Sequence, residues 1–222
     1  MKFSFRVLGY ITGALVAGFL IYMLCGQCPC FSSIGFADCS RHSNLKASGF
    51  TSYELSVINE SDSIMRVLTI DDPRDLAVLR AQSSDFSSEA LLSEEFERLS
   101  ELMVATVTHP SQDGVGIAGP QVGLNRRVVA VQRFDKEGEP FEVYPNVRIV
   151  WQSDSLAFGP EGCLSVPDRR EDVARSQEIV IEYTAVPGLK TIRDTISGFT
   201  AVIFQHEVDH LDGVLYIDRV AE

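Results

Sequence analysis

A short stretch near the end of the chain holds the residues best suited to chemistry, His206-Glu207-Val208-Asp209-His210. On a helix, positions i and i+4 share a face, so His206 and His210 can direct both imidazoles at one metal ion. Glu207 would lie beside that pair, where a carboxylate can carry a proton. Two ligands do not make a site, because two surface histidines can also fall at this spacing. The pattern therefore predicts a metal centre on condition that a third ligand exists.

Cys163 is the best candidate for that third ligand. The chain has four histidines, and the remaining two, His42 and His109, lie in segments expected to be linker and loop. A lone thiol such as Cys163 is either a small buried apolar side chain or a functional sulfur. Two imidazoles and one thiolate leave the fourth tetrahedral position for water, which is typical of a catalytic metal. The ligand set therefore indicates hydrolysis.

The elements that must position these residues are strands in the middle of the chain with helices near both ends. Apolar residues at helical spacing predict a helix over 87–106 and a second over 198–211, which would carry both histidines. Short β-rich runs predict strands at 64–70, 127–132, 141–144, 147–151 and 178–183. This order of elements predicts an α+β domain.

Three blocks of the sequence resemble the signature motifs of peptide deformylases, in the order found in that family. They are Gly114–Gln121 (GVGIAGPQ), Glu161–Ser165 (EGCLS) and Gln205–His210 (QHEVDH). Three motifs in series are far more specific than one, and the resemblance covers residues 64–222. It implies the deformylase fold, with antiparallel β-sheets around a central metal-binding helix. The chain departs from the family pattern at Gly119, where a second alanine is usual, and a glycine adds backbone freedom there.

The resemblance implies an enzyme that hydrolyses the formyl group from N-formyl-methionyl peptides or nascent chains and releases formate. One divalent ion would be held by Cys163, His206 and His210. It would be Fe²⁺ in the cell, with Zn²⁺ or Ni²⁺ as substitutes, since imidazole and thiolate suit all three. A water made acidic by the ion would attack the formyl carbon, with Glu207 as general acid/base.

The same resemblance assigns the oxyanion donors and the surroundings of the substrate. The side-chain amide of Gln121 and the backbone N–H of Leu164 would donate to the developing negative charge. The residues expected at the substrate are Gly114, Gly116, Glu161, Arg170, Phe199 and Val202. The two glycines would let a peptide approach and pair as an added strand. Phe199 and Val202 are either walls of a methionine pocket or plain core positions. Family position places Arg170 near the outer part of the peptide, and Glu161 would pair with Arg175 beside the site.

The first part of the chain differs in composition from the rest. Residues 7–24 form an uncharged apolar run, about 27 Å long as a helix and close to the thickness of a bilayer's hydrocarbon core. We expect 1–24 to be a signal anchor or a cleaved signal peptide, 25–63 a Cys- and Ser-rich linker, and 64–222 the catalytic domain. Lys2 and Arg6 precede the run and predict a body on the far side of the membrane. If the run is not a true signal, this bacterial or organellar protein would be cytoplasmic.

Two alternative functions follow from these features. The predicted anchor suggests an amidase or peptidase of the same fold that faces the cell envelope. A catalytically silent metal-binding module is disfavoured, because every expected ligand, the base and the oxyanion glutamine are present. The chain has 19 Lys+Arg against 31 Asp+Glu, a net charge of −12. Residues 1–50 carry +3, so residues 51–222 carry −12 − 3 = −15, and no direct nucleic-acid binding is expected.

Overall fold

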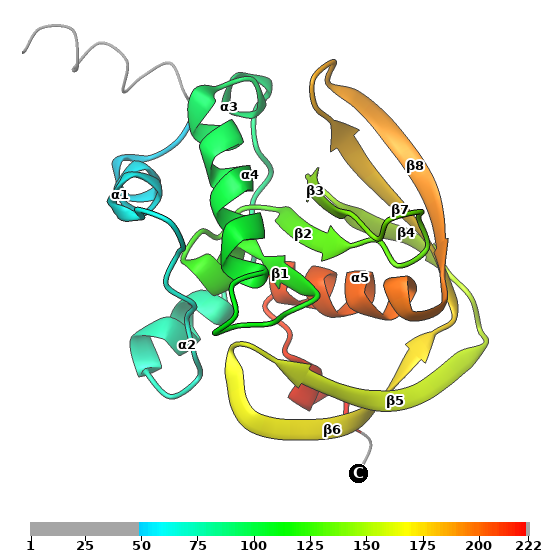
Figure 1. The fold of residues 1–222 in the computed structure, drawn as a ribbon. Helices are drawn as coiled ribbons and strands as arrows, with labels where there is room; N and C mark the ends of the chain where they lie inside the picture. Colours follow the sequence, from blue (N-terminus) through cyan, green and yellow to red (C-terminus); the bar gives the residue numbers. More distant parts are fainter. Residues whose placement is uncertain (1–48, 221–222) are drawn as a thin grey trace, which may run out of the picture. The chain divides into compact units, whose positions relative to one another are not determined.

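The computed structural model of the protein describes residues 49–220 (Figure 1). The signal or anchor expected at 1–24, with its membrane contact through 7–24, lies outside the described residues, as does most of the expected linker. Among residues 49–220, no helix combines the length and the apolar character needed to cross a bilayer.

Four helices precede the strands: α1 (Ser52–Glu60), α2 (Pro73–Leu79), α3 (Ser88–Leu91) and α4 (Glu94–Val107). Helix α1 lies inside the segment expected to be linker. It begins with a capping box, in which Thr51 Oγ1 accepts from the N–H of Glu54 and the Glu54 carboxylate accepts from the N–H of Thr51. Leu55 and Ile58 of this helix are buried in the core that α4 also builds. The structure differs from the linker expectation here, because residues 52–60 form a helix that buries apolar side chains in this core.

Two further expectations for this part of the chain do not hold. The strand expected at 64–70 does not form. Residues 65–69 have no regular secondary structure, and the segment makes one backbone hydrogen bond to each of two motif loops. Leu68 N–H donates to Gln121 O over 2.8 Å, and Ile70 N–H donates to Ser165 O over 2.9 Å. The helix expected over 87–106 is two helices, because Ser87 caps α3 and Ser93 starts a new helix as the N-cap of α4.

Every pair of named strands in the described residues is antiparallel, as expected for the fold class. One sheet has the order β1-β2-β3, a second the order β4-β7-β8, and β5 with β6 forms a hairpin. Their bounds are β1 (Gly116–Ala118), β2 (Val128–Gln132), β3 (Phe141–Pro145), β4 (Arg148–Gln152), β5 (Leu156–Cys163), β6 (Val166–Ser176), β7 (Glu178–Ala185) and β8 (Lys190–Ser197). The expected strands match β2, β3, β4 and β7. The expected α+β class is therefore confirmed, whereas β1, β5, β6 and β8 were missed.

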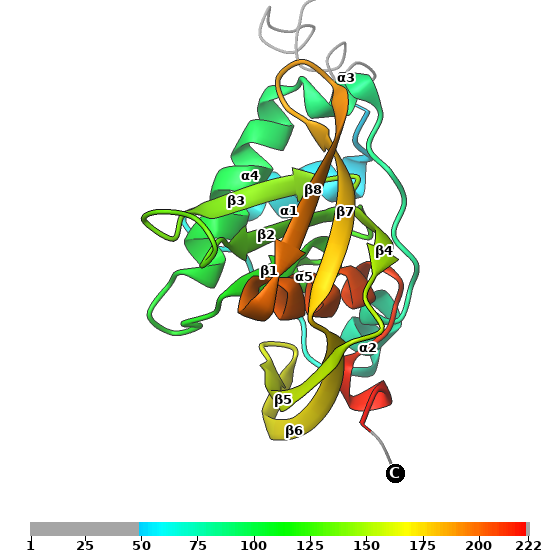
Figure 2. The ribbon, with the colours of Figure 1, turned by 90° about the vertical axis from the view of Figure 1, so that its right-hand side faces the viewer.

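Helix α5 (Gly198–Leu211) lies among these strands and carries the HExxH pattern (Figures 1 and 2). It contacts β1 and β2 of one sheet, β4, β7 and β8 of the other, and β6 of the hairpin. Its residues Ala201, Phe204, Val208 and Leu211 recur at helical spacing and are buried in one core cluster. That packing fixes the rotation of the helix about its axis, and with it the direction of both histidines.

Candidate metal centre

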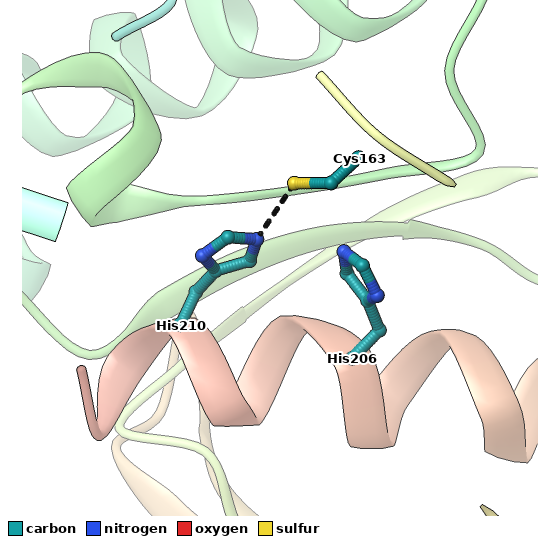
Figure 3. A group of neighbouring side chains, drawn as sticks. All are labelled: Cys163, His206 and His210. Carbon is teal, nitrogen blue, oxygen red and sulfur yellow. Dashed lines mark hydrogen bonds between the residues drawn. The ribbon is translucent and has the colours of Figure 1, made fainter. Parts of the chain in front are cut away.

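Three side chains from two elements converge beside α5 (Figure 3). His206 and His210 come from α5, and Cys163 comes from the end of β5. Their candidate ligand atoms all lie within 4.8 Å of one another, and Cys163 Sγ is 3.2 Å from His210 Nε2. The structure thus brings together all three residues expected as metal ligands.

The electrostatics of this cluster fit a divalent cation. Burial acts to lower the pKa of His206, but Cys163 and the carboxylates of Glu161 and Glu207 outweigh it and raise that pKa to about 10. The cluster therefore attracts a positive charge, and a metal ion can take the place of the proton. Burial also lowers the pKa of His210 well below its usual value, so that this imidazole is neutral, the form that binds metal.

Glu161 lies behind His206 and orients it. Its Oε2 is 2.8 Å from His206 Nδ1, which leaves Nε2 of that ring for a metal. Arg175 donates to both oxygens of Glu161, over 2.7 and 3.0 Å, and to Asp209 Oδ2 over 2.6 Å. Burial acts to raise the pKa of Glu161, yet the hydrogen bonds from His206 and Arg175 outweigh it and lower that pKa to about 2. Glu161 is thus ionised at neutral pH, and the expected pair with Arg175 is present.

Glu207 is buried beside the ligands with one oxygen unused. It is 4% exposed, and its Oε2 has no hydrogen-bond partner among the described residues. Because buried polar atoms are nearly always paired, this oxygen is suited to a water or a substrate group in the site. Burial raises the pKa of Glu207 to about 7. A carboxylate with such a pKa can both take and return a proton near neutral pH.

Gly116 gives Glu207 the space it occupies. A Cβ at position 116 would lie 2.5 Å from Glu207 Oε1 and 2.8 Å from Ile203 Cγ2. Neither distance is compatible with ordinary van der Waals contact, so the carboxylate fits only because position 116 has no side chain. This close approach could not be read from the sequence, in which Gly116 was expected only beside the peptide.

Gln121 is held with its amide group facing the metal ligands. It lies in the 3-10 turn η2 (Gly119–Val122), where its Oε1 accepts from Ala118 N–H over 2.8 Å. Its Nε2 donates to Ser165 Oγ over 3.2 Å and lies 3.5 Å from Cys163 Sγ. Ser165 was not predicted as a partner of Gln121, because a serine in a motif loop carries no sequence pattern that shows what it contacts.

The absence of a side chain at Gly119 has a local cause. A Cβ there would lie 2.6 Å from the carbonyl oxygen of Arg126 and 2.8 Å from that of Leu124. Two backbone carbonyls cannot rotate away as a flexible side chain can. In this chain the turn after η2 therefore packs closely on position 119, and the departure from the family pattern is accommodated.

A cleft of about 820 Å³ opens onto these residues. It is lined by all six positions expected at the substrate, namely Gly114, Gly116, Glu161, Arg170, Phe199 and Val202. Phe199 is 57% exposed and its ring packs against Phe134 at a centroid distance of 5.3 Å. It is therefore a wall of the cleft and not a core residue. Asp113 and Asp168 also line the cleft, each with positive φ, and no sequence pattern predicted either of them at the site.

Tyr216 is a further neighbour of the metal ligands that the sequence did not indicate. It lies in the 3-10 turn η3 (Tyr216–Asp218), and its ring stacks on that of His206 at a centroid distance of 5.8 Å. The Tyr216 hydroxyl donates to the carbonyl oxygen of Arg169 over 2.8 Å. Its contact with His206 arises from the return of the chain after α5, which no local pattern reveals.

Fold and site together define a metal-dependent hydrolase with two candidate ligands on a central helix and a third at the end of β5, and comparisons with known proteins identify the family. The model of the polypeptide deformylase family matches residues 64–222. Peptide deformylase 2 of Vibrio vulnificus (strain CMCP6) is 37% identical over 159 residues, 72% of this chain and 88% of the relative. The peptide deformylase of Caulobacter vibrioides is 35% identical over 161 residues, 72% and 89% of the two chains.

Solved structures agree with these relatives. The actinonin-bound class I type b peptide deformylase from Acinetobacter baumannii is similar with a TM-score of 0.63 and 32% identity, over 72% of this chain and 100% of that one. The peptide deformylase from Thermotoga maritima gives a TM-score of 0.63 and 31% identity over the same shares. The chain belongs to the polypeptide deformylase family.

Family membership gives the chain a hydrolase activity, the removal of the N-formyl group from nascent peptides. The family is metal-dependent, in agreement with the Cys/His/His cluster. The comparisons favour neither the envelope amidase nor the silent metal-binding module. The relatives named here are bacterial, which supports a bacterial origin.

Proposed function

We propose that the chain deformylates N-formyl-methionyl peptides with one divalent ion held by Cys163, His206 and His210. The observation that carries this proposal is the convergence of the three ligands within 4.8 Å next to the buried carboxylate of Glu207. We propose Fe²⁺ as the cellular ion, with Zn²⁺ and Ni²⁺ as substitutes, because the ligand set suits all three. When bound, the ion supplies Lewis-acid chemistry that makes water more acidic and polarises a carbonyl group.

Glu207 is proposed as the general acid/base. It takes a proton from the attacking water and delivers it to the amide nitrogen, so that the carbon–nitrogen bond breaks as the new carbon–oxygen bond is kept. The products are formate and a free amino terminus. Glu207 Oε2 supports this role, because the atom is buried at the cleft and has no hydrogen-bond partner among the described residues. Positioned proton transfer of this kind contributes roughly 10²–10⁴-fold in rate.

Gln121 and Leu164 are proposed as donors to the oxyanion. Gln121 Nε2 points toward Cys163 and is held by Ala118 and Ser165. Leu164 follows Cys163 in the turn between β5 and β6. Donors that are fixed before the reaction need no reorganisation when charge develops, and removal of one such donor costs roughly 10²–10³-fold in kcat in other enzymes.

The substrate is proposed to enter the cleft as an added strand beside β1. Within the described residues, β1 pairs only with β2, so its outer edge is open to a peptide. Phe199 and Val202 are proposed to contact the methionine side chain, since both line the cleft one to two helical turns before His206. Arg170, exposed at the mouth of the cleft, is proposed to meet the outer part of the peptide.

The test is formate release from formyl-Met-Ala-Ser by the chelated protein after reconstitution with Fe²⁺, Zn²⁺ or Ni²⁺. We expect no release without metal, the highest rate with Fe²⁺, and a lower rate when alanine replaces the formylated methionine. Equal rates for the two peptides would contradict the methionine pocket, and equal rates with and without metal would contradict the metal centre.

Residues 7–24 are an uncharged apolar run preceded by Lys2 and Arg6, a composition typical of a signal or anchor segment. We propose that residues 1–24 are a signal anchor or signal peptide, and that the folded body begins near residue 50, since Phe50 is buried in the core. Mass spectrometry of the mature N-terminus distinguishes the two. An intact Met1 in a membrane fraction supports an anchor, an N-terminus after residue 20 supports cleavage, and an intact soluble chain contradicts both.

A further inference from the structure

A second cavity, of about 720 Å³, lies on another face of α5. Helix residues Gln205, Val208 and Asp209 line it, and none of its lining residues lines the substrate cleft. Small-molecule sites usually have volumes of about 300–1,000 Å³. The cavity therefore has the size of a ligand site and is separate from the metal centre.

Arginine side chains dominate the polar wall of this cavity. Four arginines line it against two aspartates: Arg127, Arg148, Arg175 and Arg219 against Asp209 and Asp212. Arg148 and Arg175 also bind carboxylates outside the wall, those of Asp85 and Glu161. The four arginines and these four carboxylates sum to zero charge, so in a body that carries −15 an anion is repelled less here than by the surface as a whole.

Two of these guanidinium groups keep a donor nitrogen for a ligand. Arg127 donates from Nε to Val147 O and from Nη1 to Asp212, with Nη2 unpaired among the described residues. Arg219 donates from Nε and Nη2 to Asp209, with Nη1 unpaired in the same part of the chain. Guanidinium donors that face a cavity are well matched to the oxygens of a phosphate or carboxylate group.

The Ser83 hydroxyl is independent evidence for a ligand in the cavity. Ser83 lines the cavity, is 8% exposed, and its Oγ has no hydrogen-bond partner among the described residues. A buried hydroxyl without a partner is rare and is normally explained by a water or a ligand.

The cavity lining also includes large apolar side chains. Trp151 and Leu156 line the cavity with 49% and 53% of their surfaces exposed. Large exposed apolar side chains beside a polar cavity are typical of binding sites. An indole ring also packs well against a flat aromatic group.

We propose that this cavity binds a small amphiphilic anion, whose oxyanion group accepts from Arg127 and Arg219 and whose aromatic ring packs on Trp151. The two cavities share no lining residue, so the site is distinct from the substrate cleft, and Arg175 joins its wall to Glu161 behind His206. Its ligand class is defined by one oxyanion group next to one planar apolar ring.

Trp151 is the only tryptophan of the chain, so its fluorescence reports on the cavity directly. The experiment titrates the metal-loaded full chain with phenyl phosphate, and separately with inorganic phosphate and with phenol. We expect a saturable fluorescence change with phenyl phosphate. Its half-saturation should occur at a concentration about tenfold or more below that of inorganic phosphate or of phenol, since the phosphate group and the ring both contribute to the affinity. No saturable change with phenyl phosphate would overturn the proposal.

Variants locate the binding. Arg219→Gln removes one charged donor and should weaken binding about tenfold. Ala174→Leu should also weaken it, because it fills the cavity while every arginine stays in place. Arg74→Gln is the matched control, since Arg74 forms an exposed ion pair with Asp72 and neither residue lines either cavity. Unchanged affinity in both test variants would overturn the proposal.

Discussion

At the residue scale, we propose different roles for Glu207 and for the three candidate metal ligands, and substitution separates these roles. Glu207→Gln should retain metal and lose roughly 10²–10⁴-fold in kcat, because proton transfer is lost while every ligand stays. Cys163→Ala should lose both metal and turnover, because one of three protein ligands is gone. Metal analysis and formate release on the same samples measure the two effects. Equal loss of metal in both variants would contradict the role given to Glu207.

Gly116 is predicted to act on Glu207 by steric means. In Gly116→Ala the new Cβ would lie 2.5 Å from Glu207 Oε1, so the carboxylate must move. We expect kcat to fall at least tenfold, which corresponds to an increase of roughly 1.4 kcal/mol in the activation free energy. Bound metal should be unchanged. The matched control is Gly159→Ala on β5, where a Cβ meets nothing within 4 Å. A rise in KM with unchanged kcat would show that position 116 acts on peptide binding instead.

At the scale of elements, the turn η2 depends on close backbone packing at Gly119. Gly119→Ala introduces the residue usual in the family, yet we expect it to lower the free energy of unfolding by about 1–3 kcal/mol, as overpacking does. The cause is the contact of 2.6–2.8 Å with the carbonyl oxygens of Arg126 and Leu124. Urea denaturation measures the change, with Gly159→Ala as control. Stability equal to that of the unsubstituted protein would show that the turn relaxes without cost.

The elements also show what the sequence could and could not predict. The HExxH helix, its position and its histidine face were predictable, because apolar periodicity and ligand spacing agree over 198–211. The hairpin of β5 and β6 was missed, because Gly159 and Pro160 interrupt β5 and β6 has a run of exposed charged residues. Motif resemblance still identified Cys163 at its end.

Contacts between segments distant in the chain could not be predicted from the sequence. The segment 64–70 has the composition of a strand, but it does not pair as one. Its backbone N–H groups donate instead to the carbonyl oxygens of Gln121 and Ser165. Whether an apolar run pairs in a ladder depends on which neighbours the fold provides, and no local pattern contains that information.

At the scale of the whole molecule, an ion pair ties α1 to the body. Glu54 is 8% exposed and accepts from Arg126 Nη2 over 3.0 Å. Burial acts to raise the pKa of Glu54, but hydrogen bonds from Arg126 and Thr51 outweigh it and lower that pKa below 4.5. A carboxyl group whose pKa is lower when folded stabilises the protein above its unfolded pKa, and that stability is lost as the pH falls through the folded pKa.

The pair therefore predicts part of the acid sensitivity of the protein. Glu54→Gln should lower the free energy of unfolding at neutral pH, and the difference from the unsubstituted protein should shrink as the pH falls below 4.5. Urea denaturation over this pH range measures it. Glu60→Gln, on the exposed part of the same helix, is the control. A difference that stays constant with pH would contradict this role of Glu54.

At the scale of the whole molecule, we propose that one divalent ion held by Cys163, His206 and His210 makes this chain a deformylase. The most direct test is a titration of the chelated full chain with Fe²⁺ under anaerobic conditions, with metal content and formate release from formyl-Met-Ala-Ser measured at each point. We expect formate release to rise with bound metal and to saturate at one ion per chain. Metal bound at that stoichiometry without formate release would contradict it.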